Sequence, residues 1–165
     1  MKGITANLLI LILTSFGHAQ MSYARFPGTK SPLLSPNRRY ILRNVDRNRE
    51  PYHSIFLTDT RTGKTRKVYD YGRHASVLWA PDSRHFAIND YAGSDFTGTH
   101  IVSVDGAAPL IDVQRDIRDK SVSTERPAQG DHEYFGVARW MDNRRVIVTG
   151  DMMIGRRFAS ATNTS

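Results

Sequence analysis

The stretch Trp79–Ile88 reads WAPDSRHFAI, a tight turn that opens onto a short apolar strand. Pro81 fixes the backbone φ angle at the start of this turn, and Asp82 tolerates the backbone geometry that a turn requires. The same plan recurs at residues 35–42 (SPNRRYIL) and at residues 140–148 (WMDNRRVIV). The first two copies are about 45 residues apart, which is the length of one four-stranded propeller blade. The sequence therefore predicts repeated, blade-like units.

Short strands are predicted between these turns, because β-branched and aromatic residues form runs with Gly, Asp or Pro at their ends. The runs are residues 40–45, 53–58, 65–69, 76–79, 85–89, 99–104 and 109–113. A helix is predicted only at residues 113–119. The predicted fold class is all-β, with antiparallel four-stranded blades in a partial β-propeller-like meander.

We expect one domain over residues 20–165, with two to three blades at about residues 31–70, 71–113 and 136–165. The third turn follows the second at a longer interval, which implies an insertion of about fifteen residues in this unit relative to one blade length. The polar segment 114–135 is predicted to be the resulting long loop.

The turn in Trp79–Ile88 and the DTRTGK turn at Asp59–Lys64 resemble those of the TolB-like (WD40-like) β-propeller repeat family. Blades of that family carry a W-S-P-D-G-K/R turn before an apolar strand. The resemblance covers about residues 31–149 and implies a propeller-like fold of two to three blades, without naming a ligand. The chain departs from the family pattern at the turn glycine, which is replaced by Arg38, Ser83 and Asn143.

Residues 1–19 are predicted to be a signal peptide. Lys2 supplies a positive start, Leu8–Leu13 is a short apolar run, and Ala19 offers a small residue for cleavage before Gln20. A membrane anchor is the alternative, but the apolar run is shorter than the ~20 residues that span a bilayer. The chain has no cysteine, so it has neither a lipoprotein acylation site nor a disulfide. We expect a periplasmic or secreted protein with no membrane span after cleavage.

Basic residues outnumber acidic ones, with 23 Lys and Arg against 16 Asp and Glu and a formal net charge of +7. The surplus is scattered along the chain, which is typical of a solvated surface. The densest cluster, at residues 38–49, is divided between two faces by the alternation of side chains in a strand. We therefore expect no nucleic-acid partner.

The longer connections are predicted to share one end of the blades, because strand direction alternates in an antiparallel meander. Long loops on a rigid scaffold are where binding residues concentrate, although polar residues are common in any surface loop. The predicted binding surface comprises Arg47, Arg49, Arg73, His74, Asp90, Tyr91, Asp95, His132 and Glu133.

No catalytic residue, metal ligand or cofactor is predicted for this chain. The sequence lacks H-E-x-x-H, G-x-S-x-G and a glycine-rich phosphate loop after a strand. The pattern Asn44-x-Asp46-x-Asn48 is similar to the start of a calcium loop, but Arg49 stands where the glycine belongs.

The sequence favours a non-catalytic binding or scaffold protein of the bacterial envelope. Two alternatives stay open: a hydrolase that uses loop carboxylates with His74 or His132, and a vestigial propeller fragment without a function of its own. A hydrolase requires that these loop groups converge in a pocket, whereas a binding module requires only an open surface.

Two or three blades are too few to close a ring, since propellers have about four or more. The outer blade faces are then uncovered, and either a second copy or another envelope protein is expected to cover them. Alternatively, residues 21–30 and 152–158 fold over these faces. The apolar positions of the repeated strands are predicted to be buried: Leu42, Ile55, Leu57, Leu78, Trp79, Phe86, Ile88, Ile101, Val104, Trp140 and Ile147.

Overall fold

The computed structural model describes residues 22–50, 52–93, 96–106, 110–120, 132–154 and 157–164. The strands are β1 (Tyr23–Phe26), β2 (Leu33–Leu34), β3 (Tyr40–Asp46), β4 (His53–Asp59), β5 (Thr65–Tyr71), β6 (Ala75–Trp79), β7 (His85–Asp90), β8 (Phe96–Ser103), β9 (Ile111–Asp112), β10 (His132–Trp140), β11 (Val146–Ile154) and β12 (Arg157–Thr164). The helix α1 (Val113–Lys120) follows β9 directly. The described residues thus confirm the predicted all-β class and the short helix.

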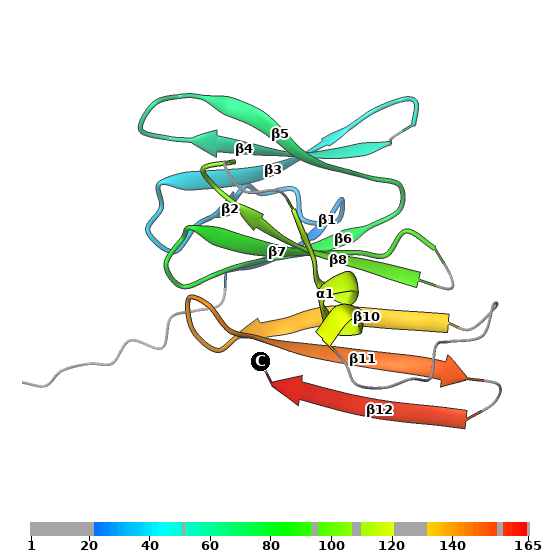
Figure 1. Ribbon diagram of the computed structural model, residues 1–165. Helices are drawn as coiled ribbons and strands as arrows, with labels where there is room; N and C mark the ends of the chain where they lie inside the picture. Colours follow the sequence, from blue (N-terminus) through cyan, green and yellow to red (C-terminus); the bar gives the residue numbers. More distant parts are fainter. Residues whose placement is uncertain are drawn as a thin grey trace, which may run out of the picture.

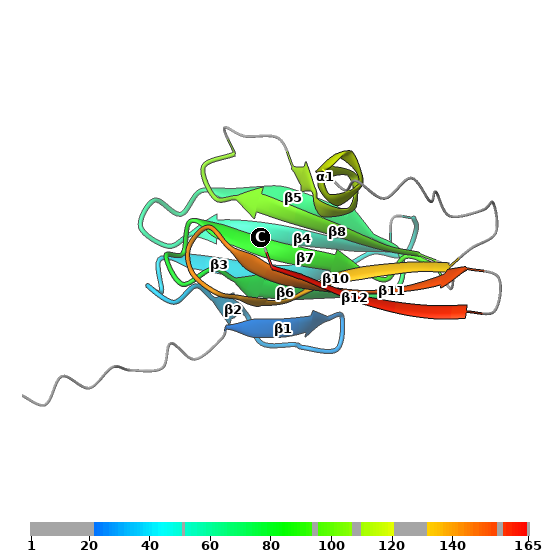
Figure 2. The same ribbon diagram turned by 60° about the horizontal axis from the view of Figure 1, so that its bottom comes forward.

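The strands form three stacked tiers (Figure 1). The first sheet is the antiparallel meander β2-β3-β4-β5. The middle layer has the order β1-β6-β7-β8, with β9 on the outer side of β8. The third layer is β10-β11-β12, joined to β8 by parallel pairing at Phe96 and Thr97 alone. Figure 2 shows α1 beside the strands of the middle layer.

The three turns that predict the repeat share one hydrogen-bond pattern. In each, an Asx side chain accepts a hydrogen bond from the backbone N–H two residues later: Asn37 from Arg39 at 3.0 Å, Asp82 from Arg84 at 2.9 Å and Asp142 from Arg144 at 2.8 Å. Arg38 and Ser83 have φ angles of 61° and 62°. These two residues adopt the left-handed conformation that glycine takes most readily, so the turn geometry is retained without the glycine.

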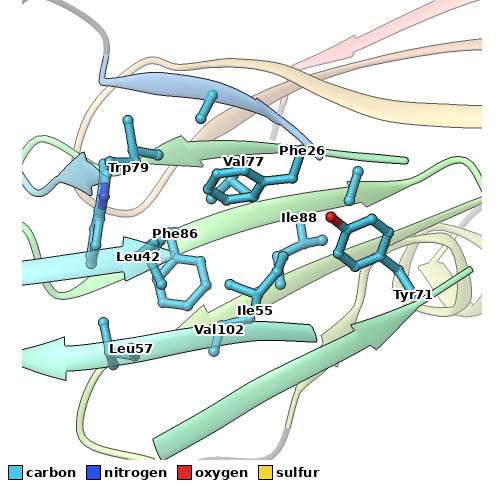
Figure 3. Close-up of a cluster of buried hydrophobic side chains, with 13 residues drawn as sticks. Phe26, Leu42, Ile55, Leu57, Tyr71, Val77, Trp79, Phe86, Ile88 and Val102 are labelled. Atoms are coloured by element: carbon cyan, nitrogen blue, oxygen red, sulfur yellow. The ribbon is translucent and has the colours of Figure 1, made fainter. Parts of the chain in front are cut away.

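A hydrophobic core joins the first sheet to the middle layer (Figure 3). The first sheet contributes Leu42, Ile55 and Leu57, and the middle layer contributes Phe26, Val77, Trp79, Phe86 and Ile88. The Trp79 ring centroid lies 5.0 Å from that of Phe86 and 6.3 Å from that of Tyr40. Burial of these large apolar side chains is the main contribution that holds two sheets face to face.

A second core joins the opposite face of the middle layer to α1 and the third layer. Leu78 and Ala87 pack with Val113, Val137 and Val148. The side chain of Asn89 donates to the Val137 carbonyl at 3.0 Å and accepts from the Val137 N–H at 2.9 Å. Its amide nitrogen also donates to the Ser76 hydroxyl at 3.2 Å, so this one side chain joins β6, β7 and β10.

The two tryptophans occupy equivalent places in successive layers. Trp79 packs towards the first sheet, whereas Trp140 packs towards the middle layer, where its indole N–H donates to the Leu78 carbonyl at 3.1 Å. Each layer therefore presents the same position to the layer before it, as successive blades do.

Seven of the residues predicted to be core are buried: Leu42, Ile55, Leu57, Leu78, Trp79, Phe86 and Ile88. Ile101, Val104, Trp140 and Ile147 are only half-buried, because they lie on β8, on the turn after it and in the third layer, where the packing is open on one side.

The N-terminal segment is not a cover over an open face. It forms β1, which pairs with β6 and buries Ala24 and Phe26 in the first core. The predicted loop at 114–135 contains most of α1 at its start and the first residues of β10 at its end. Among the described residues, no helix is long and apolar enough to cross a membrane.

Candidate functional site

The longer connections share one end of the first sheet and middle layer, as predicted; we name it the loop end. The strand register places Asp46 opposite His53, His53 opposite Tyr71, and Ala75 opposite Asp90. The connections β3–β4, β5–β6 and β7–β8 therefore leave the sheets on the same side.

At the loop end, three of the predicted binding residues come together. The rings of His74 and Tyr91 stack with centroids 4.6 Å apart, and the Tyr91 N–H donates to the His74 carbonyl at 3.0 Å. Burial lowers the pKa of His74, and the charges of Arg25 and Arg73 lower it further. The sequence did not point to Arg25, which β1 brings beside His74.

Asp90 lies in the interior rather than on the predicted surface. It is only 6 % exposed, and its carboxylate accepts a hydrogen bond of 2.9 Å from the Tyr69 hydroxyl. The Tyr69 ring lies 5.2 Å from the ring of His100, centroid to centroid. Burial raises the pKa of Asp90 and lowers that of His100. Asp90 thus belongs to a polar cluster between the first sheet and the middle layer.

Among the remaining predicted residues, only Arg47 and Arg49 have side chains that the structure describes. Arg47 and Arg49 are exposed on the β3–β4 connection. Asp95 lies outside the described residues, as do the side chains of His132 and Glu133. Within the part of the chain that the structure describes, the charges that act on His74 are cationic, so the carboxylate partner that a hydrolase needs is not beside it.

Two residues of the calcium-like pattern, Asn44 and Asp46, form hydrogen bonds within the first sheet. Asp46 lies 2.9 Å from the His53 ring nitrogen and accepts one hydrogen bond from the Asn44 side-chain amide, and these contacts lower the pKa of Asp46. The Tyr71 hydroxyl donates to the Asn44 side chain. No cluster of three metal-ligating side chains occurs among the residues that can be described.

A cavity lies at the other end of the sheets, where the connections between strands are tight. We name it the turn-end cleft. It has a volume of about 630 Å³ between the first sheet and the turn after β8. Its lining comprises Arg39, Tyr40, Leu57, Asp59, Thr62, Lys64, Thr65, Arg66, Val104 and Asp105. The sequence did not predict this cleft, because each tight turn alone is typical of a purely structural connection.

Both arginines that line the turn-end cleft, Arg39 and Arg66, form hydrogen bonds. Arg39 forms a paired contact with Asp59, at 2.9 and 3.4 Å, which lowers the pKa of that carboxyl. The Arg66 guanidinium donates through Nη2 to the carbonyls of Ser103 and Val104 at 2.9 and 3.2 Å. These two hydrogen bonds join β5 to the end of β8 and fix one wall of the cleft.

The face of the first sheet that points away from the middle layer, here the outer face, carries apolar side chains together with the charged Arg43, Lys67 and Asp70. Cross-strand partners share a face, so the register groups Leu34 with Ile41, and Val45 with Ser54. Leu34 is 36 % exposed and Val45 is 43 % exposed. Figure 1 shows the first sheet as the outermost tier, with no other described layer over it.

Comparisons of this chain with protein-family models, with curated proteins and with solved structures found no significant match. The case for its function therefore depends on the geometry of the described residues.

Proposed function

We propose that the protein is a non-catalytic interaction module of the bacterial envelope, exported from the cytoplasm, which docks a further blade-like sheet on its outer face. The observation that supports this most strongly is the position of Leu34 and Ile41. In the repeat, these two residues correspond to Trp79 and Phe86, which the first sheet covers.

The contrast between the equivalent positions is large. Trp79 and Phe86 are 2 % and 0 % exposed, whereas Leu34 lies open on the outer face. Val45 adds a second exposed apolar side chain further along the same face, beyond Arg43. Burial of such area stabilises an association by ~25 cal/mol per Å² before the costs of association. The outer face thus has the chemistry of a blade face that lacks its neighbour.

The occupant that we propose is a second copy of this chain. The first sheet and the third layer lie at opposite ends of the stack (Figure 1), so the third layer of one copy can meet the outer face of the next. Such head-to-tail contacts close into a ring when the rotation per copy allows it. Two copies with three layers each give six layers, within the four to eight blades of known propellers.

The hydrolase alternative is less well supported, because His74 lies among arginines and the buried Asp90 is bonded to Tyr69. A vestigial fragment accounts poorly for Asn37, Asp82 and Asp142, which keep the same turn hydrogen bond in all three units.

Photo-crosslinking in the periplasm tests this proposal. A benzophenone amino acid is placed at Val45, on the outer face, or at Tyr52 in the β3–β4 connection; these side chains are 43 % and 44 % exposed. We expect an adduct of twice the chain mass from Val45 and none from Tyr52. An adduct with a different envelope protein would overturn the second copy as the occupant, and no adduct at Val45 would overturn docking altogether.

Mass measurement of the purified periplasmic protein tests the proposed export. We expect a mature chain that begins at about Gln20. Recovery of the uncleaved chain in the membrane fraction would contradict an exported, released protein.

A further inference from the structure

We propose that the turn-end cleft binds an amphipathic carboxylate. Its anionic group contacts Lys64 and Arg66, and its apolar part covers the floor formed by Tyr40, Leu57 and Val104. This binding is independent of the outer face, because the cleft opens at the turn end of the sheets, between the first sheet and the middle layer.

Three cationic side chains line the cleft, Arg39, Lys64 and Arg66, against the carboxylates of Asp59 and Asp105, which leaves one net positive charge. Arg39 and Asp59 neutralise one another through their paired contact. The Lys64 ammonium has no ion pair among the described residues. Both hydrogen bonds of Arg66 use Nη2 and end on backbone carbonyls, and the Asp105 carboxylate accepts a hydrogen bond of 2.6 Å from the Ser103 hydroxyl.

The fixed position of the Arg66 side chain also favours binding of an anionic group. Its guanidinium is fixed by two carbonyls, while Nε and Nη1 make no hydrogen bond to the described residues. A guanidinium that is held in place loses little side-chain entropy when it binds an anion, and its planar donors match the two oxygens of a carboxylate. Gly106 lies against Arg66, where an added Cβ would approach the guanidinium carbon to 3.3 Å, so the turn leaves room for this side chain.

The floor of the cleft favours a ligand with an apolar body. The Tyr40 ring stacks with that of Trp79, and the Arg39 guanidinium carbon lies 5.0 Å from the Tyr40 ring centroid. Leu57 and Val104 complete the apolar surface. A compact inorganic anion would contact only the cations, whereas an acid with an aromatic or aliphatic body contacts both. The volume of about 630 Å³ suits a small molecule or the end of a peptide.

Titration calorimetry with matched probes tests the proposal on the mature chain. The probes are N-acetylphenylalanine, its neutral amide, octanoate, acetate and inorganic phosphate. We expect the acid to bind at least tenfold more tightly than the amide, and acetate and phosphate to bind more weakly than the acid. Octanoate distinguishes two classes of carboxylate ligand. Tighter binding than that of N-acetylphenylalanine indicates a fatty acid, and weaker binding indicates an amino acid or the carboxyl end of a peptide.

Lys64→Gln and Lys67→Gln are the matched variants. Lys64 lines the cleft, whereas Lys67 is paired with Asp70 on the outer face at 2.5 Å. We expect Lys64→Gln to weaken binding of the acid about three- to tenfold and to leave amide binding unchanged, and Lys67→Gln to change neither. Equal affinity for acid and amide, no binding of the acid, or equal effects of the two variants would overturn the proposal.

Discussion

The backbone N–H of Asn37 donates a hydrogen bond of 3.0 Å to the Ser83 hydroxyl oxygen, 46 residues further along the chain. The two residues lie in equivalent turns of the first sheet and the middle layer. Ser83 is fully buried and has a φ angle of 62°. Ser83 thus stands at the position of the turn glycine. Its hydroxyl adds a hydrogen bond that joins the turn of the middle layer to the equivalent turn of the first sheet.

This relationship predicts different stabilities for two substitutions at Ser83. Ser83→Ala leaves the Asn37 N–H without its acceptor and keeps a side chain in the left-handed conformation, so we expect a loss of about 1–3 kcal/mol. Ser83→Gly loses the same acceptor but relieves the backbone, so it is expected to be more stable than the alanine variant by up to about 1 kcal/mol. Urea denaturation measures both; an alanine variant as stable as the wild type would contradict the role of the hydroxyl.

Trp79→Ala is expected to lower the free energy of unfolding by about 3–5 kcal/mol, as other large-to-small core changes do. Trp79 fills the first core between Tyr40 and Phe86. Trp140→Ala is the matched comparison and is expected to cost less, because Trp140 is only half-buried. Chemical denaturation of the two variants checks the order; a loss below about 1 kcal/mol for Trp79→Ala would show that the layers do not depend on this contact.

Asp90 makes stability depend on pH in a predictable direction. Burial raises its pKa in the folded state above the usual value, so the folded state holds the proton more tightly than the unfolded state. The contribution of Asp90 to stability is therefore complete below its unfolded pKa and is lost as the pH rises through its folded pKa. Asp90→Asn removes this titration.

We expect the stability of Asp90→Asn relative to the wild type to increase as the pH rises from about 4 upwards, from the usual pKa of an aspartate. The amide oxygen can still accept the Tyr69 hydrogen bond. Denaturation curves at several pH values measure the difference; a difference that does not vary with pH would contradict a raised pKa.

The first sheet and the middle layer were largely predictable from the sequence, because their signals are local. Pro36 and Pro81 mark turns, the Asx residue after each proline closes its turn, and the apolar runs between the turns form β3 to β8. The burial of Leu42 and Ile88 follows from the same repeat.

Pairings between distant segments were not predictable in this way. Tyr23–Phe26 has no local signal that selects the edge of β6, and the pairing of β10 with β8 involves Phe96 and Thr97 alone. The turn-end cleft escaped prediction for the same reason, since Lys64 and Val104 come from turns in different layers. In the predicted site, Arg73, His74 and Tyr91 lie together. Asp90 is instead buried between the first sheet and the middle layer, where the Tyr69 hydroxyl donates a hydrogen bond to it.

The central claim is that a second copy of the chain docks on the outer face. Sedimentation of the mature chain over a hundredfold concentration range tests this claim most directly. We predict that the wild type associates as its concentration rises, and that Val45→Lys, which replaces an exposed apolar side chain of the outer face by a further positive charge, shifts association to higher concentration. A compact monomer at every concentration, or a Val45→Lys variant that associates as readily as the wild type, would contradict the proposed docking of a second copy on this face.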